Sequence, residues 1–386
     1  MSFEFPEEKF PIPKLVWHGA AGPARAMPFD FNRESRLILQ AEVDGRVSTL
    51  LMDSGMEVSA ISRDLFSRLH RKSAGTLPIY DRGALQETQL VQGVDVSLPM
   101  VSIRGMTVAV MDMDLLCSMI GLRIDGVLGR EIFEAAFVDI DFPQRQIAFA
   151  PAGAAFHSVA AATTPLRRFK AGRGRIIAVL LESGPPVELE FDLGSANPLV
   201  LQSSYWKPNG LHLDRRLSNS LVGGANGIRE TGLISMKEVS FAGFTLTGVD
   251  ALLEQPTPGF DHRLGHGTIG MPILSKFRIG ADYTNNVLHV SSPSKTGAIP
   301  IPRNRTGLRV LQQNQYLRVL LVARDSPAAK ENWQPGDLIR LVNGRPIDDV
   351  YWSSGFWRWG EADAGTEVCL TMENGGIRYL ILGDYY

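Results

Sequence analysis

Two aspartates, Asp53 and Asp192, lie at the ends of predicted strands, where their carboxylates could act in acid–base catalysis. Each ends a strand-like run, Leu50–Met52 or Leu189–Phe191, and each is followed by small residues typical of tight turns. Either turn alone would be an ordinary loop closure. Two carboxylates brought face to face cannot both ionise cheaply, so they share one proton and titrate as a unit. One can act as general base on a water while the other protonates the carbonyl under attack. The pair therefore predicts hydrolysis of peptide bonds with no metal and no cofactor.

The two aspartates belong to an internal repeat. Asp192 lies 139 residues after Asp53, and the hairpin before each aspartate aligns at the same offset. Further along, residues 267–274 correspond to residues 126–133 at an offset of 141. Blocks in the same order at nearly constant spacing predict two equivalent units, each presenting one aspartate to the other.

The elements expected to position these aspartates are two β-hairpins. They comprise residues 37–43 and 47–52 around Asp44-Gly45, and residues 176–181 and 187–191 around Ser183-Gly184. Asp-Gly favours a tight hairpin because both turn positions tolerate positive φ. The spacing of apolar residues predicts a short helix within residues 62–70, mostly strands to about residue 110, and a further hairpin over residues 138–149.

These motifs resemble those of the pepsin and retropepsin-like aspartic peptidases. Asp53-Ser54-Gly55 and Asp192-Leu193-Gly194-Ser195 resemble the two aspartate loops, and Val127-Leu128-Gly129 and Thr268-Ile269-Gly270 resemble the apolar-apolar-Gly strands that cross beneath them. The resemblance covers roughly residues 35–292. It implies a mainly β, bilobal, pepsin-like double-β-barrel aspartic protease fold with a pseudo-twofold repeat. Peptides or proteins would be the substrates.

The resemblance also implies roles for individual residues. Asp53 and Asp192 would be catalytic, supported by Ser54, Gly55, Gly194 and Ser195. Substrate-binding flaps would include Tyr80 and Gly83 in the first lobe, and Gly224 and Gly227 in the second lobe. Leu193 departs from the pattern, because a threonine or serine usually grips the opposite loop there. Met56 also departs, since a small or hydroxylated residue usually follows the first glycine.

A different pattern begins after residue 305. Ser326-Pro327-Ala328-Ala329, Pro335-Gly336-Asp337 and Asn343-Gly344 follow one another in an order that resembles a PDZ domain of the bacterial arrangement, a small α+β fold. The resemblance implies a possible C-terminal peptide ligand that is added as a strand, with a terminal carboxylate captured by backbone N–H groups at Thr306, Gly307 and Leu308. Five nearby aromatic residues, Tyr351, Trp352, Phe356, Trp357 and Trp359, would pack in a core or contact a peptide or a lobe.

The patterns together predict six segments. These are an N-terminal lead-in (1–34), aspartic protease lobe 1 (35–150), a linker (151–165), lobe 2 (166–292), a second linker (293–305) and the PDZ-like peptide-binding domain (306–386).

Composition excludes few classes of function. The net charge of −2 over 386 residues gives no basic footprint for nucleic acid, and no apolar stretch is long enough to span a bilayer. The seven histidines and two cysteines form no metal-ligand pattern. The N-terminus lacks the features of a secretory leader, so we expect a cytoplasmic protein, or a periplasmic or secreted one if a leader was removed. The alternative to a peptidase is a catalytically degenerate pepsin-fold protein that binds peptides or acts as an adaptor.

Overall fold

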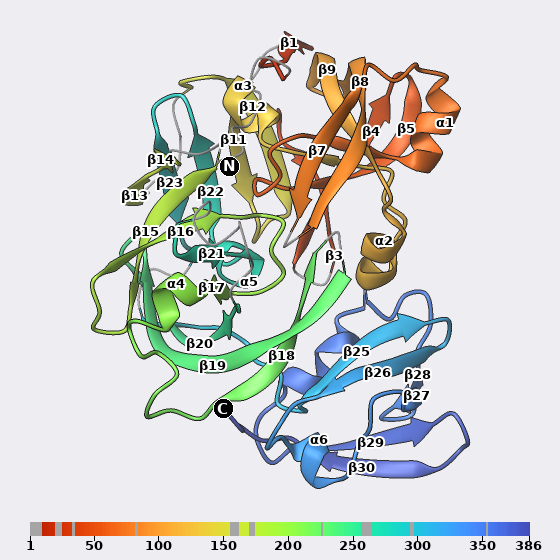
Figure 1. The fold of residues 1–386 in the computed structure, drawn as a ribbon, viewed down its shortest axis with the longest axis vertical. Helices are drawn as coiled ribbons and strands as arrows, with labels where there is room; N and C mark the ends of the chain where they lie inside the picture. The colour runs from red at the N-terminus through yellow and green to blue at the C-terminus, as the bar shows by residue number, and fades with distance from the viewer. Residues whose placement is uncertain are drawn as a thin grey trace.

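The computed structural model describes residues 10–19, 25–32, 35–81, 84–154, 162–169, 174–224, 227–255, 265–293, 297–352 and 354–386. Within these ranges the chain is mainly β, and its strands form four sheets with short helices between them (Figure 1). The side chains of residues 79–86 and 224–227 are not part of this description.

The first sheet contains Asp53 at the end of one of its inner strands. Its described strands are β1 (Lys14–Trp17), β3 (Asp30–Asn32), β4 (Arg36–Val43), β5 (Arg46–Met52), β6 (Ala60–Ser62), β7 (Thr76–Asp81), β8 (Ala84–Ser97), β9 (Val101–Met111) and β10 (Gly126–Leu128). The β4–β5 hairpin turns at Asp44 and Gly45 with φ of 47° and 77°, as the Asp-Gly pair predicts. Strand β10 lies beside β5 in parallel, with Val127 opposite Leu51.

The second sheet repeats this arrangement around Asp192. Its described strands are β14 (Arg167–Arg168), β15 (Arg175–Leu181), β16 (Pro186–Phe191), β17 (Leu199–Leu201), β18 (Ser218–Gly224), β19 (Gly227–Phe241), β20 (Phe244–Leu253), β21 (Gly267–Ile269) and β24 (Ile299–Pro300). Strand β21 lies parallel to β16 with Thr268 opposite Glu190. These two residues are the repeat equivalents of Val127 and Leu51, so the pairing of the inner strands is the same in both sheets.

A central six-stranded sheet joins the two halves of the described chain. It contains β2 (Met27–Pro28), β11 (Ala136–Asp141), β12 (Gln146–Pro151), β13 (Ala162–Pro165), β22 (Arg278–Asp282) and β23 (Val287–Ser291). Strands β11 and β22 pair antiparallel with Asp139 opposite Gly280. These residues are themselves 141 positions apart, so equivalent residues of the repeat face each other. This is the register that a twofold axis between the two strands requires.

The segments expected to be a lead-in and linkers also contribute strands. Strand β1 pairs with β9, β2 with β12, and β3 with β4. Strand β13 pairs with β23, and β24 with β20. The predicted lead-in and both predicted linkers therefore include residues that occupy ladder positions in the sheets.

The C-terminal unit, residues 306–386, has a separate sheet and a separate apolar core. Its strands are β25 (Leu308–Gln313), β26 (Tyr316–Val322), β27 (Leu338–Val342), β28 (Arg345–Pro346), β29 (Glu367–Met372) and β30 (Ile377–Ile381). Tyr351 and Trp352 are buried in the core of this unit, and Phe356, Trp357 and Trp359 pack against it. Figure 1 shows the unit in blue, below α2 and beside β18.

The helices are short and cap the ends of strands. They are α1 (Arg63–Leu69), α2 (Asp114–Ile120), α3 (Glu131–Ala135), α4 (Ser203–Trp206), α5 (Met271–Leu274), α6 (Pro327–Lys330) and the 3-10 helix η3 (Phe356–Glu361). Helix α1 begins where the Ser62 side chain accepts the Leu65 N–H, which satisfies one of the free donors of the first turn. No helix in the described part of the chain is long and apolar enough to cross a membrane.

Candidate active site

Asp53 and Asp192 each follow an inner strand and are held by the neighbouring parallel strand. The Asp53 N–H donates to Leu128 O at 2.9 Å, and the Asp192 N–H donates to Ile269 O at 3.2 Å. The acceptors belong to the apolar-apolar-Gly segments noted in the sequence. The two aspartate loops are therefore fixed by the same hydrogen bond at equivalent positions.

The two glycines, Gly55 and Gly194, bring the aspartate loops into contact. Each glycine N–H donates to the carboxylate of its own loop, Gly55 to Asp53 Oδ1 at 2.7 Å and Gly194 to Asp192 Oδ1 at 2.8 Å. A Cβ added at Gly55 would overlap the carboxylate of Asp192, and one at Gly194 would overlap the carboxylate of Asp53. Each carboxylate thus lies against the glycine of the opposite loop, so the two are close together.

The electrostatics of this pair favour one retained proton. Burial raises the pKa of Asp53 to about 7, and the charge of Asp192 adds to the rise. The Gly55 N–H, Arg36 and Arg130 oppose it. Between about pH 4 and pH 7, Asp53 therefore retains a proton that an ordinary aspartate would have lost.

Ser54 joins the two loops through its buried hydroxyl. Its Oγ donates to Phe191 O and accepts the Leu193 N–H, both at 2.9 Å. The first loop thus grips the backbone of the second loop. Leu193 has no hydroxyl to return this grip, and its side chain is fully buried in the apolar core.

Arg130 supplies a second connection, which the sequence analysis did not identify. Its Nε donates to Ser54 O at 2.7 Å, and its Nη2 donates to Gly55 O at 3.0 Å. The same guanidinium contacts Glu57 at 3.1 Å and the buried carboxyl group of Glu190. Arg130 therefore ties the Asp53 loop to the strand that leads into Asp192.

Glu190 is an acidic group two residues before Asp192. Burial raises its pKa to about 8, a rise that Arg130 opposes and the charge of Asp192 increases. A glutamate within the strand-like run Leu189–Phe191, together with the arginine directly after Gly129, was the available sequence signal for this contact. Glu57, just past the Asp53 loop, is also paired with Arg130 and is 34% exposed.

Ser195 lies at the end of the Asp192 loop, and its support of Asp192 stays a prediction. Its hydroxyl donates to Asn197 O and accepts the Asn197 N–H, both at 3.4 Å. Its backbone N–H donates to Asp192 O at 3.3 Å, so Ser195 closes the turn of the Asp192 loop.

Hairpins are present at both expected flap positions. Strands β7 and β8 pair Tyr80 with Leu85, and strands β18 and β19 pair Gly224 with Gly227. Gly83 lies outside the described residues. The substrate contacts of these hairpins stay a prediction.

The expected carboxylate loop of the C-terminal unit is already hydrogen-bonded internally. Asn304 Oδ1 accepts the N–H groups of Thr306 and Gly307 at 3.0 and 3.1 Å, and Thr306 Oγ1 accepts the Leu308 N–H at 2.8 Å. Thr306 is fully buried. A peptide carboxylate would have to displace these side-chain acceptors, and its capture by this loop stays a prediction.

The described residues contain no group of side chains that could bind a metal ion. No three His, Cys, Asp or Glu side chains within those ranges are grouped so as to hold a metal ion. Cys117 and Cys369 are both free thiols.

Comparison with known proteins points to the first half of the chain. Residues 39–132, which carry Asp53, match the family model described as aspartyl protease. Among solved structures, the aspartic proteinase from Irpex lacteus is 15% identical with a TM-score of 0.46, and the alignment covers 71% of this chain and 98% of that chain. No curated protein sequence matches. On the family match, the predicted enzyme class is confirmed at the level of an aspartic-type peptidase.

Proposed function

We propose that the chain is an aspartic endopeptidase that hydrolyses peptide bonds with a water activated by Asp53 and Asp192. The observation that carries this proposal is the reciprocal contact of the aspartate loops, in which each carboxylate lies against the glycine of the other loop. The raised pKa of Asp53 is what a proton shared within such a pair requires.

The reaction uses the pair as base and acid together. The ionised carboxylate takes a proton from a water molecule while the water oxygen attacks the carbonyl carbon of the peptide bond. The protonated carboxyl group gives its proton to the carbonyl oxygen. The resulting tetrahedral diol collapses when the protonated carboxyl gives its proton to the leaving nitrogen while the ionised carboxylate takes a proton from a diol hydroxyl. The C–N bond breaks, a carboxylic acid and an amine are released, and the pair again holds one shared proton. Ser54 and Arg130 would keep the two loops in register during these transfers, since both side chains bond to backbone atoms of the loops.

We further propose a bilobal, pepsin-like double-β-barrel architecture with a pseudo-twofold repeat. Lobes 35–150 and 166–292 would meet at the aspartates, and the matched strand pairings and the β11–β22 register support this. The substrate would lie between the lobes, under the hairpins β7–β8 and β18–β19.

The C-terminal unit is proposed to be a PDZ-like, peptide-binding domain that assists substrate or partner binding. Its separate core and its edge strand β25 support a binding module beside the peptidase. Its Ser-Pro-Ala-Ala, Pro-Gly-Asp and Asn-Gly turns are the basis of the PDZ resemblance.

The decisive experiment is incubation with a mixed peptide pool from acidic to neutral pH, read by mass spectrometry. Cleavage that is lost in Asp53→Asn and in Asp192→Asn supports the proposal. Asp349→Asn, at an exposed surface position, serves as the matched control and should cleave normally. Peptides that bind but stay intact would favour the alternative, a degenerate peptide-binding protein.

A further inference from the structure

The hairpin β18–β19, which is the proposed second flap, is bonded to the C-terminal unit at the start of β18. Ser218 Oγ donates to Arg324 O at 2.8 Å, and the Arg324 N–H donates to Asn219 Oδ1 at 2.7 Å. Asn219 Nδ2 in turn donates to Glu230 of β19 at 2.8 Å. Both Ser218 and Asn219 are buried. The backbone of Arg324, in the C-terminal unit, is therefore linked to both strands of the hairpin.

Apolar packing strengthens this attachment. Val222 of β18 and Leu233 of β19 are buried in one apolar cluster with Leu321 and Ala323 of the C-terminal unit. Movement of the hairpin away from the unit would expose these side chains to water, which is unfavourable. The hydrogen bonds at Arg324 and the apolar cluster therefore hold the hairpin in the same place.

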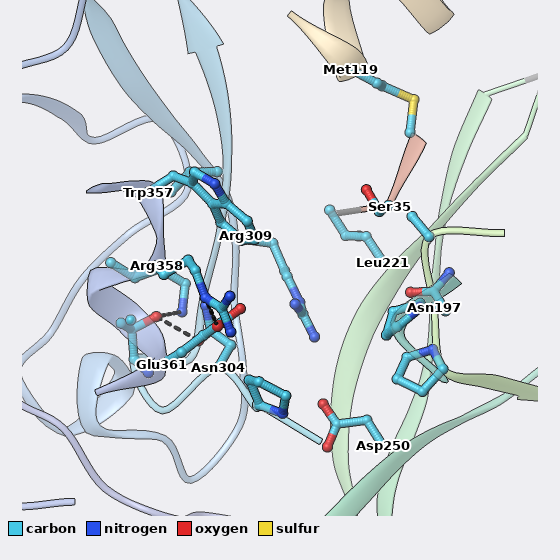
Figure 2. A pocket seen from close by; sticks show the side chains of 18 of the residues that line it. Ser35, Met119, Asn197, Leu221, Asp250, Asn304, Arg309, Trp357, Arg358 and Glu361 are labelled. Atoms are coloured by element: carbon cyan, nitrogen blue, oxygen red, sulfur yellow. Dashed lines mark hydrogen bonds and ion pairs between the residues drawn. The ribbon is translucent and has the colours of Figure 1, made fainter. Parts of the chain in front are cut away.

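A cavity of about 370 Å³ lies between the hairpin and the C-terminal unit beyond this attachment (Figure 2). Leu221 and Gly223 of β18 line one side of the cavity, and Trp357 of η3 lines the other. Met119 of α2 lies at one end. The polar contacts between the hairpin and the unit are therefore concentrated at the start of β18, and the following part of the strand borders the cavity.

The far part of β18 lies against helix α2, which comes from the first half of the chain. A Cβ added at Gly223 would overlap the end of the Met119 side chain, so Met119 lies directly against the Gly223 backbone. Helix α2 also contacts the C-terminal unit, because a Cβ added at Gly121 would overlap the Trp352 ring. The hairpin is thus held at one end by the C-terminal unit and at the other by α2.

We propose that the C-terminal unit restrains the second flap, so that the hairpin β18–β19 opens for a substrate only when its hydrogen bonds to Arg324 break. The inference rests on the peptidase function proposed above, in which the substrate lies under this hairpin. Flap opening often limits the rate of an enzyme whose site lies beneath a flap. Because opening has to break the contacts at Ser218 and Asn219, these contacts slow the access of substrates to the two aspartates.

The test uses the full-length double variant Ser218→Ala/Asn219→Ala, which removes both side-chain bonds to Arg324. We expect amide hydrogen exchange of residues 218–224 to become faster by about tenfold or more, as the loss of two hydrogen bonds predicts. Exchange of β4, in the first sheet, should not change, which checks that the chain stays folded. Ser240→Ala, at the other end of β19, is the matched control and should exchange like the unmodified protein.

The single variant Ser218→Ala gives a second measurement that does not depend on the double variant being stable. It removes one bond to Arg324 and leaves the link between Asn219 and Glu230 intact. We expect an intermediate increase in the exchange of residues 218–224. Unchanged exchange in both variants would overturn the proposal.

Cleavage of the mixed peptide pool tests the effect on access. The kcat/KM of the double variant should rise several-fold, while its pH dependence should not change, because neither substitution touches the aspartate loops. Faster exchange together with equal or lower kcat/KM would also overturn the proposal, since the contacts would then support catalysis or leave it unaffected. If no protein cleaves peptides at any pH, the peptidase function fails, and hydrogen exchange alone decides whether the C-terminal unit restrains the hairpin.

Discussion

The Arg130 side chain, from the first half of the chain, reaches the carboxyl group of Glu190 in the second half, directly behind the two aspartate loops. Both side chains are almost fully buried, at 1% and 4% exposure. Leu193 cannot provide the hydroxyl grip that Ser54 provides from the other side. The Arg130 contacts therefore form a second link, between the Asp53 loop and the strand that leads into Asp192.

The first prediction concerns Arg130→Lys. A lysine ammonium cannot bond Ser54 O, Gly55 O and Glu190 together, because it lacks the planar fork of donors. We expect a loss of about 3 kcal/mol in the free energy of unfolding and a lower kcat with little change in KM, since loop alignment and not substrate contact is affected. Urea unfolding and peptide cleavage measure both effects.

The matched control is Arg167→Lys, at an exposed arginine that contacts Glu188 on the same strand as Glu190. A surface pair contributes about 0–1 kcal/mol, so this variant should behave like the unmodified protein. Equal stability and activity in the two variants would contradict the role assigned to Arg130.

The second prediction concerns Gly194→Ala. The added methyl group would overlap the Asp53 carboxylate, so the loops must separate or the carboxylates must move. We expect cleavage to fall by at least about 100-fold, because displacements near 1 Å have that effect on catalysis. Gly383→Ala is the control, since a Cβ there meets an ordinary contact at 3.6 Å. An active Gly194→Ala protein would argue against the close approach of the two loops.

The sequence predicted that the Asp53 and Asp192 loops would face each other, but it did not predict the contact between Arg130 and Glu190. The preference of Asp44-Gly45 for a tight turn depends only on neighbouring residues, so it can be read from the sequence. The repeat can also be read there, and the two signals together predicted the hairpins that lead into Asp53 and Asp192. Strand β10 and helix α3 both begin within residues 126–133, the block that the repeat aligns with residues 267–274. The Arg130 contact depends on where a long side chain goes after the two halves have met, and periodicity carries no such information.

The remaining differences have similar physical causes. Strands such as β1 and β13 are short and weakly patterned, and they form because a neighbouring sheet edge offers a partner. The loop at Thr306 lies where the sequence predicts it. Asn304, two residues earlier, accepts hydrogen bonds from the N–H groups of Thr306 and Gly307, which the sequence analysis assigned to a peptide carboxylate. Local side-chain acceptors of this kind compete with any external partner for the backbone.

The third prediction is a pH dependence set by Asp53. Its pKa of about 7 lies above the value of 3.8 in an unfolded chain, so the folded protein retains a proton that the unfolded chain has released between these values. Stability should therefore fall as pH rises from about 4 to 7, and cleavage should fall as pH rises through about 7, where the shared proton is lost.

Asp53→Asn removes this titration. The variant should be inactive, yet above pH 7 it should be more stable than the unmodified protein by a few kcal/mol, on the order implied by the change in pKa. Urea unfolding at pH 5 and pH 8 measures the difference. A parallel pH dependence in both proteins would assign the titration to another group.

The last prediction concerns how the C-terminal unit is attached to the second sheet. The Tyr386 hydroxyl donates to Asp250 Oδ2 at 2.7 Å, and Arg303 lies over the Tyr386 ring at 4.2 Å. Tyr386→Phe keeps the ring but removes the donor, so the largely buried Asp250 carboxylate loses one of its partners at a cost of about 1–3 kcal/mol. We expect faster hydrogen exchange at Leu321 and Ala323, which pack in the same apolar cluster. Tyr379→Phe, at a ring that is 55% exposed, should exchange like the unmodified protein. Unchanged exchange in Tyr386→Phe would mean that apolar packing alone holds the unit in place.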